Sequence, residues 1–194
     1  YSTSVWDLKS AKEISSINPK FIKIGSATNT NYKVLNYLLK NFQGKIHVSL
    51  GMTNKKEEEK LIDLFTKHKR NKDLILYACT SAYPVETKDS CLLEVSRLVE
   101  KYKRKNLVMD IGFSGHHKGI ALDVAAFVLG ANYIERHFTL DRTWKGTDHS
   151  ASLEPDGIRR LKRNLEETFN ALKYKDKEIL DVEIASRNKL KYKN

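Results

Sequence analysis

The sequence predicts an α/β fold in which the chain forms about six of the eight strand–helix units of a (β/α)8 TIM barrel. Short β-rich runs alternate with amphipathic helical patterns at spacings of roughly 25 to 33 residues. Such alternation is typical of a parallel sheet covered by helices. Polar side chains follow the ends of the strand-like runs, which is the edge where a barrel places its active site.

The expected elements occupy residues 1–173, which we interpret as a partial barrel domain. Five runs have the composition of buried strands: Phe21–Ser26, Ile46–Gly51, Leu74–Thr80, Leu107–Phe113 and Tyr133–Phe138. Ser2–Val5 is expected to end one more strand, before a helix over Asp7–Ile17. The pattern over Ile120–Leu129 is apolar nearly all round and predicts the most buried helix. Residues 174–194 are charged and weakly periodic, and predict a helix end and a linker.

An open, doubly wound sheet is the competing architecture. No GxGxxG or GxxxxGK[ST] motif follows any strand-like run, so a nucleotide-binding version of that sheet has little support. Six units are two short of a full barrel, and the chain opens on Tyr1 inside a strand-like run. We therefore expect the first two strand–helix units to be missing and the chain to be a fragment.

Composition narrows the class of protein. Of the 194 residues 40% are hydrophobic, which is enough for a sizeable core, and no apolar run is long enough to predict a membrane span. The net charge of +11 permits nucleic-acid binding, but the basic residues are mixed with acids, which favours a solvated surface that steers anionic substrates. Two cysteines, Cys79 and Cys91, make no disulfide framework, so a cytoplasmic location is expected.

Two histidines end neighbouring strand-like runs. His116 and His137 would approach one another at the barrel mouth, where two imidazoles with water and substrate oxygens make an open divalent-metal site. The alternative is that one histidine caps its strand and the other packs beneath a loop. We interpret three other histidines as structural: His47, His68 and His117.

An acid and a lysine are expected inside the barrel. Glu135 precedes His137 by two residues, so both side chains share one face of their strand, while Arg136 faces the helices. Lys23 inside a barrel would need an anionic partner, and the alternative is a lysine that extends to solvent at the strand end.

Small hydroxyl side chains recur at equivalent strand ends. They suit phosphate oxygens without blocking the mouth, although any one of them could be a turn residue: Ser26, Ser49, Ser81 and Ser114. The segment Asp141–Pro155 is long and polar, which is typical of a substrate-binding loop and equally of a solvated connection.

Several segments closely resemble the sialic acid synthase family. They are Ala78–Pro84 (ACTSAYP), Ile111–Ile120 (IGFSGHHKGI) and Tyr133–Pro155 (YIERHFTLDRTWKGTDHSASLEP), with further matches at Ser2–Asp7, Phe21–Asn31 and Val48–Met52. The resemblance extends to about Lys173. It implies a (β/α)8 barrel, then a small antifreeze-like domain that this chain lacks, and a homodimer in which that domain reaches the partner's site.

The resemblance also implies a reaction. Phosphoenolpyruvate would condense with an N-acetylated, mannosamine-like sugar to give a nonulosonic acid and phosphate. The family's divalent metal, Mn²⁺ or else Mg²⁺ or Co²⁺, would bind His116 and His137, and Glu135 is a candidate base. The phosphoenolpyruvate contacts fall on Lys23, Ser26, Ser49, Ser81 and Ser114. The sugar contacts fall on Tyr83 and Asp148, and on Thr28, where many members carry an acid.

Two alternative functions stay open. Lys23 could be the nucleophile of a Schiff-base aldolase, or the chain could be a non-catalytic barrel remnant that binds a sugar phosphate. A barrel without two strands has exposed edges, so the isolated segment is expected to be inactive and poorly stable.

Overall fold

The computed structural model describes residues 1–192, and its centre is a five-stranded parallel sheet in the order β1-β2-β3-β4-β5. Every strand pairs with its neighbour in sequence, as a barrel requires. The strands are β1 (Phe21–Ile24), β2 (Lys45–Ser49), β3 (Leu74–Cys79), β4 (Asp110–Gly115) and β5 (Tyr133–Arg136). No helix among the described residues has both the length and the apolar character needed to cross a bilayer.

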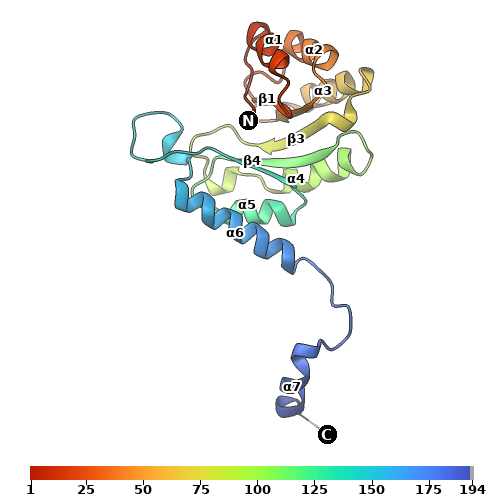
Figure 1. The fold of residues 1–194 in the computed structure, drawn as a ribbon, viewed down its shortest axis with the longest axis vertical. Helices are drawn as coiled ribbons and strands as arrows, with labels where there is room; N and C mark the ends of the chain where they lie inside the picture. Colours follow the sequence, from red (N-terminus) through yellow and green to blue (C-terminus); the bar gives the residue numbers. More distant parts are fainter. Residues whose placement is uncertain (193–194) are drawn as a thin grey trace.

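Helices separate the strands along the chain and cover one face of the sheet (Figure 1). They are α1 (Leu8–Ile17), α2 (Tyr32–Asn41), α3 (Lys55–Lys67), α4 (Leu93–Leu98), α5 (Ala121–Val128), α6 (Pro155–Ala171) and α7 (Asp181–Leu190). Single turns lie at η1 (Asn71–Asp73), η2 (Thr87–Asp89), η3 (Val99–Lys103) and η4 (His149–Ala151).

Side chains alternate strictly between the two faces of the sheet. The face toward the helices is apolar and almost fully buried, and includes Ile22, Ile24, Ile46, Val48, Leu74, Leu76, Ile111 and Phe113. The opposite face is the inside of the curled sheet, where polar and aromatic side chains stand: Lys23, His47, Ser49, Tyr77, Ser114, Tyr133 and Glu135. Two-residue periodicity therefore places the functional groups on one surface and the helix-packing groups on the other.

All five strands differ from their predicted bounds by one to three residues at an end, and one further predicted strand is almost absent. β4 begins at Asp110 and not at Leu107, because Asn106 adopts a left-handed φ of 56° and the Leu107 amide still bonds to the preceding turn. The strand expected to end at Ser2–Val5 is reduced to one parallel bridge between Ser4 and Lys23. The described chain thus holds five full strands and the trace of a sixth.

The prediction that the helix near Ile120–Leu129 is the most buried is wrong. In α5 only Asp123 and Ala126 are buried, and Val128 is 54% exposed. The helix packs against β4, β5 and α6, and among the described residues nothing covers its outer side.

The charged segment after Lys173 contains one more helix than expected. The α7 helix lies apart from the sheet at the end of an extended connection (Figure 1). The Glu183 carboxylate caps its start by accepting the Leu180 amide at 2.8 Å and pairs with Lys175. A helix held by capping and surface ion pairs needs no apolar stripe, so periodicity gave no signal for it.

Candidate active site

A cavity of about 480 Å³ opens at the carboxyl ends of the strands, inside the curled sheet. It gathers residues from every strand and from the loop after β5. Ten of the eleven predicted site residues line it: Lys23, Ser26, Ser49, Ser81, Tyr83, Ser114, His116, Glu135, His137 and Asp148.

Lys23 forms the floor of this cavity. Its ammonium donates to Ser49 Oγ at 2.8 Å and to Glu135 Oε2 at 2.5 Å, so its anionic partner is an acid of this same chain. Burial raises the pKa of Glu135, but the charge and hydrogen bond of Lys23 lower it, and the net pKa lies below the ordinary glutamate value. Glu135 is therefore an ionised carboxylate at neutral pH.

The serine hydroxyls lie around this floor. Ser26 and Ser81 approach one another over Gly51, where an added Cβ would lie 2.1 Å from Ser81 Oγ and 2.6 Å from Ser26 Oγ. The Cys79 thiol lies between the same two hydroxyls, 3.6 Å from Ser26 and 3.9 Å from Ser81. Gly51 thus makes room for these two side chains.

The two histidines meet at the mouth. The ring centroids of His116 and His137 are 5.1 Å apart, with the rings close to perpendicular. His116 is only 3% exposed, and this burial lowers its pKa below the ordinary histidine value despite its backbone hydrogen bond to Thr80. A neutral imidazole has a free lone pair, which is what a metal ligand requires.

The hydrogen-bond partners of both imidazoles suit a metal site. The Thr80 carbonyl lies 2.8 Å from His116 Nδ1, and an Asp148 carboxylate oxygen lies 3.2 Å from His137 Nδ1. We assign the N–H to Nδ1 in both rings, which leaves Nε2 of each ring as the ligand atom; Nε2 of His116 lies 3.4 Å from Ser114 Oγ. Within residues 1–192 no third His, Cys, Asp or Glu completes a cluster, so the pair fits an open site whose other positions are filled by water or substrate.

Tyr83 and Asp148 flank the histidines on the solvent side. The Tyr83 ring packs 4.3 Å from the His116 ring and 5.4 Å from the His137 ring, and the residue is 41% exposed. Asp148 comes from the loop after β5, which returns to the strand end through a parallel bridge between Phe138 and Leu153. Both residues therefore stand where a second substrate would enter.

Thr28 is the predicted residue that the structure does not bring into the cavity. It is 8% exposed, and its hydroxyl faces the carbonyls of Val5 and Gly25 at 3.4 and 3.3 Å. The chain turns at Gly25 directly after β1, and this turn directs Thr28 away from the mouth.

The cavity is also lined by residues that the sequence did not predict as site residues, among them Ser4, Trp6, Ala27, Met52, Cys79 and Thr147. Trp6 and Met52 are 64% and 71% exposed, so both present apolar surface at the rim. Large apolar residues just after strand ends, where polar residues are usual, are the sequence signal that could have identified Trp6 and Met52.

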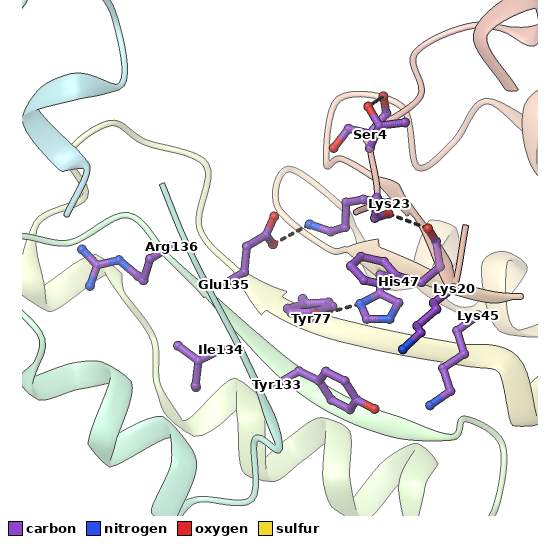
Figure 2. A pocket seen from close by; sticks show the side chains of 13 residues that line it. Ser4, Lys20, Lys23, Lys45, His47, Tyr77, Tyr133, Ile134, Glu135 and Arg136 are labelled. Carbon is purple, nitrogen blue, oxygen red and sulfur yellow. Dashed lines mark hydrogen bonds and ion pairs between the residues drawn. The ribbon is translucent and has the colours of Figure 1, made fainter. Parts of the chain in front are cut away.

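A larger cavity, of about 1010 Å³, lies below the first, toward the amino ends of the strands. Figure 2 shows its aromatic and cationic lining, with the bond between Lys23 and Glu135 as a dashed line. Ser4, Lys23 and Glu135 line both cavities. Side chains fill this space in a closed eight-stranded barrel, and here the larger cavity lies between the edge strands β1 and β5.

An aromatic layer supports Lys23 from below (Figure 2). The Lys23 ammonium lies 4.8 Å from the centre of the Tyr77 ring, and the Tyr77 hydroxyl lies 2.8 Å from His47 Nδ1. Tyr77 lies flat over Gly112, where an added Cβ would be 2.5 Å from the ring. Burial, and then the charge of Lys23, lower the pKa of His47 to about 4. His47 is thus neutral and packs as part of this floor, in agreement with its structural interpretation.

Comparisons with known proteins agree with this geometry. Residues 1–177 match the sequence model of the NeuB family. The chain is 35% identical over 190 residues to the N-acetylneuraminate-9-phosphate synthase of Mus musculus, an alignment that covers 98% of this chain and 51% of the relative. It is 34% identical over 162 residues to an N,N'-diacetyllegionaminic acid synthase of Campylobacter jejuni, covering 83% of this chain and 47% of that protein.

A solved structure shows the same arrangement. The N-acetylneuraminic acid (sialic acid) synthetase of Leptospira borgpetersenii superposes with a TM-score of 0.81 at 30% identity, over 98% of this chain and 65% of that one. This chain spans about half the length of the curated relatives it matches. The match over nearly all of its residues shows that the chain is a member of the NeuB family, the family of the sialic acid synthases.

Proposed function

We propose that this chain is the greater part of the catalytic barrel of a nonulosonic acid synthase, which condenses phosphoenolpyruvate with an N-acetylated, mannosamine-like amino sugar and releases phosphate. One observation carries the proposal: a single cavity joins an anion-binding floor, Lys23 with its serines, to a pair of metal-competent histidines at the mouth. The names of the synthases matched above support the same reaction class.

The floor would hold phosphoenolpyruvate. Lys23 and the hydroxyls of Ser26, Ser49, Ser81 and Ser114 donate to phosphate and carboxylate oxygens and fix the enol carbon below the mouth. Tyr83 and Asp148 would hold the sugar above it, so that its aldehyde carbon faces carbon 3 of phosphoenolpyruvate.

His116 and His137 would hold a divalent metal through their Nε2 atoms. The first candidate is Mn²⁺, followed by Mg²⁺ and Co²⁺. When bound, the metal would polarise the aldehyde oxygen of the sugar. Carbon 3 of phosphoenolpyruvate then forms the new C–C bond, water adds at carbon 2, and phosphate leaves from that carbon. Glu135 is ionised and can accept the proton of that water.

The remaining expectations belong to the same proposal. We infer that the enzyme acts as a cytoplasmic homodimer and that the 194 residues alone are inactive. A Schiff-base aldolase is disfavoured, because Lys23 already donates to Glu135 and Ser49 and is arranged to bind anions. A non-catalytic remnant would bind sugar phosphate without turnover.

Phosphate release is the experiment that tests the proposal. It uses the longest natural chain that contains these residues, called the parent chain below, with Mn²⁺ or a chelator and a panel of N-acetylated hexosamines, their 6-phosphates and diacetamido dideoxy sugars. We expect release that needs the metal and one sugar, and loss in His116→Ala and His137→Ala but not in His68→Ala directly after α3. Turnover that survives the chelator would contradict the mechanism, and trapping of Lys23 by borohydride with a keto acid would favour the aldolase.

A further inference from the structure

Arg136 stands between Glu135 and His137 in the chain but belongs to the opposite face of β5. Its side chain is 2% exposed, and Figure 2 shows it pointing away from the Lys23–Glu135 pair. The sequence prediction that Arg136 faces the helices is thus confirmed. A buried guanidinium is costly unless charge and hydrogen bonds compensate it, so its partners show what it does.

The partners of Arg136 come from three different segments. Its Nη1 donates to Asp123 Oδ2 on α5 at 2.6 Å and to the Gly119 carbonyl at 2.8 Å. Its Nη2 donates to the His117 carbonyl at 2.6 Å and to the Ala151 carbonyl at 3.3 Å. One side chain therefore ties β5 to the loop after β4, to α5 and to the turn η4.

The loop after β4, the end of β5 and the start of η4 each carry a residue of the cavity. His116 directly precedes the His117 carbonyl, and His137 directly follows Arg136. Asp148 begins the turn that ends at Ala151, whose amide bonds to the Asp148 carbonyl at 3.1 Å. The guanidinium thus lies behind both histidines and behind the carboxylate that orients His137.

The contact between Arg136 and Asp123 uses Nη1 and Oδ2 alone, and among the described residues Arg136 Nε and Asp123 Oδ1 have no hydrogen-bond partner. An added Cβ at Gly115 would lie 2.9 Å from Asp123 Oδ1 and 3.0 Å from the His117 ring, so the carboxylate fills the space beside a missing side chain. Asp123 is fully buried. A lysine ammonium could not replace the Arg136 guanidinium, because it lacks the planar fork of two nitrogens.

We propose that Arg136, anchored by Asp123, is the positioning residue that sets the distance between His116 and His137 and the orientation of Asp148. It touches none of the reacting atoms and acts through the backbone of the segments that carry them. The inference rests on the proposed function where the metal is concerned, and on geometry alone where the positions of the imidazoles are concerned.

A matched ion pair elsewhere in the chain provides the control. Arg97 on α4 donates to Glu58 on α3 through both nitrogens, at 2.9 and 2.7 Å, and Glu58 is 4% exposed. This pair joins two outer helices and lines neither cavity. Arg97→Lys therefore disturbs another arginine–carboxylate pair, in which the arginine side chain is 24% exposed and the carboxylate is buried, without reaching the mouth.

The test compares Arg136→Lys, Asp123→Asn and Arg97→Lys in the parent chain. Mn²⁺ affinity is followed by the spin-resonance signal of the free ion, and the two imidazoles are followed by NMR after ¹⁵N-labelling of histidine. We expect Arg136→Lys to weaken Mn²⁺ binding by roughly 10- to 100-fold and to shift the imidazole signals of His116 and His137 in the metal-free protein. Arg97→Lys should lower the melting temperature but change neither readout.

Unchanged imidazole signals and Mn²⁺ affinity in Arg136→Lys, with a melting temperature lowered as in Arg97→Lys, would overturn the inference. If Arg136→Lys does not fold, Asp123→Asn replaces it, because that variant keeps the three carbonyl contacts of Arg136 and removes only the charge of its anchor. A parent chain that binds no Mn²⁺ would refute the proposed metal role, while shifted imidazole signals in Arg136→Lys would still support the positioning role.

Discussion

Lys23 Nζ lies 2.5 Å from Glu135 Oε2, although the two residues stand on β1 and β5, the opposite edge strands of the sheet. In a flat sheet of five strands these side chains would lie about 19 Å apart, at the 4.7–4.9 Å spacing of neighbouring strands. Their contact shows that the sheet curls far enough for its edges to face one another. The pair is therefore both a binding element of the cavity and a link across the inside of the sheet.

Removal of the lysine should affect stability and activity together. In Lys23→Met the Glu135 carboxylate loses its cation, and we expect the free energy of unfolding to fall by about 2 to 3 kcal/mol. The loss stays below that of a fully buried pair because the Glu135 side chain is 33% exposed. Urea unfolding of the parent chain measures the change, and phosphate release should fall by roughly 100-fold or more.

A double variant separates the two roles of the pair. Lys23→Met combined with Glu135→Leu leaves no unpaired charge, so most of the lost stability should return. Phosphate release should stay as low as in Lys23→Met, because the lysine that would bind the anion is still missing. A single Lys23→Met variant as stable as the parent would show that the ion pair does not contribute to the folded state.

His47 should make stability depend on pH in acid. Its pKa is about 4 in the folded protein against an ordinary histidine pKa of 6.5, so the unfolded chain binds the proton more tightly. Stability should thus fall as the pH drops from 6.5 to about 4, by at most about 3 kcal/mol, and this contribution should be constant above pH 6.5. In His47→Gln this part of the decline should disappear. Parallel pH curves for parent and variant would contradict the assignment.

The aromatic floor should not tolerate a methyl group at Gly112. The added Cβ of Gly112→Ala would lie 2.5 Å from the Tyr77 ring and 3.0 Å from the Tyr133 carbonyl, so the ring must move. We expect a loss of about 1–3 kcal/mol in the free energy of unfolding. Gly25→Ala is the matched control for stability, since no atom lies within 4 Å of its added Cβ. Equal melting temperatures for the two variants would argue against the packing described.

Tyr83 should govern the use of the sugar and not the binding of the metal. Tyr83→Ala removes the ring that packs against both histidines, and we expect the KM for the sugar to rise about tenfold while Mn²⁺ affinity stays within about threefold of the parent. Tyr83→Phe should restore most of the loss. Trp144→Ala is the control, because Trp144 packs on His149 outside the cavity. A KM unchanged in Tyr83→Ala would remove Tyr83 from the sugar site.

Local patterns were sufficient to predict which side chains share a face of a strand and which strand ends share the mouth. Strand alternation predicts that Glu135 and His137 share a face and that Arg136 takes the other, and the structure places them so. The strand ends of a parallel sheet converge, so Ser49 and Ser114 could be assigned to one mouth before any distance was known. These relationships depend only on spacing within a strand and on the direction of the strands.

Relationships across the sheet could not be predicted in this way. The contact of Lys23 with Glu135 and the bond between His47 and Tyr77 depend on how strongly the sheet curls, which no single strand encodes. The burial of α5 depends on what covers it, and its apolar composition alone suggested a deeper position. Thr28 is displaced by a turn that begins one residue after β1 ends, within the uncertainty of any predicted strand boundary.

The ammonium group of Lys23 has three N–H donors, and Ser49 and Glu135 use two of them. One donor is left over for an incoming oxygen of a phosphate or carboxylate. An anion can therefore bind while Lys23 keeps its bonds to Ser49 and Glu135. The strands that carry these residues need not move when the anion binds. Under the proposed function, the Lys23 donor that would bind phosphoenolpyruvate is therefore in place before the ligand arrives.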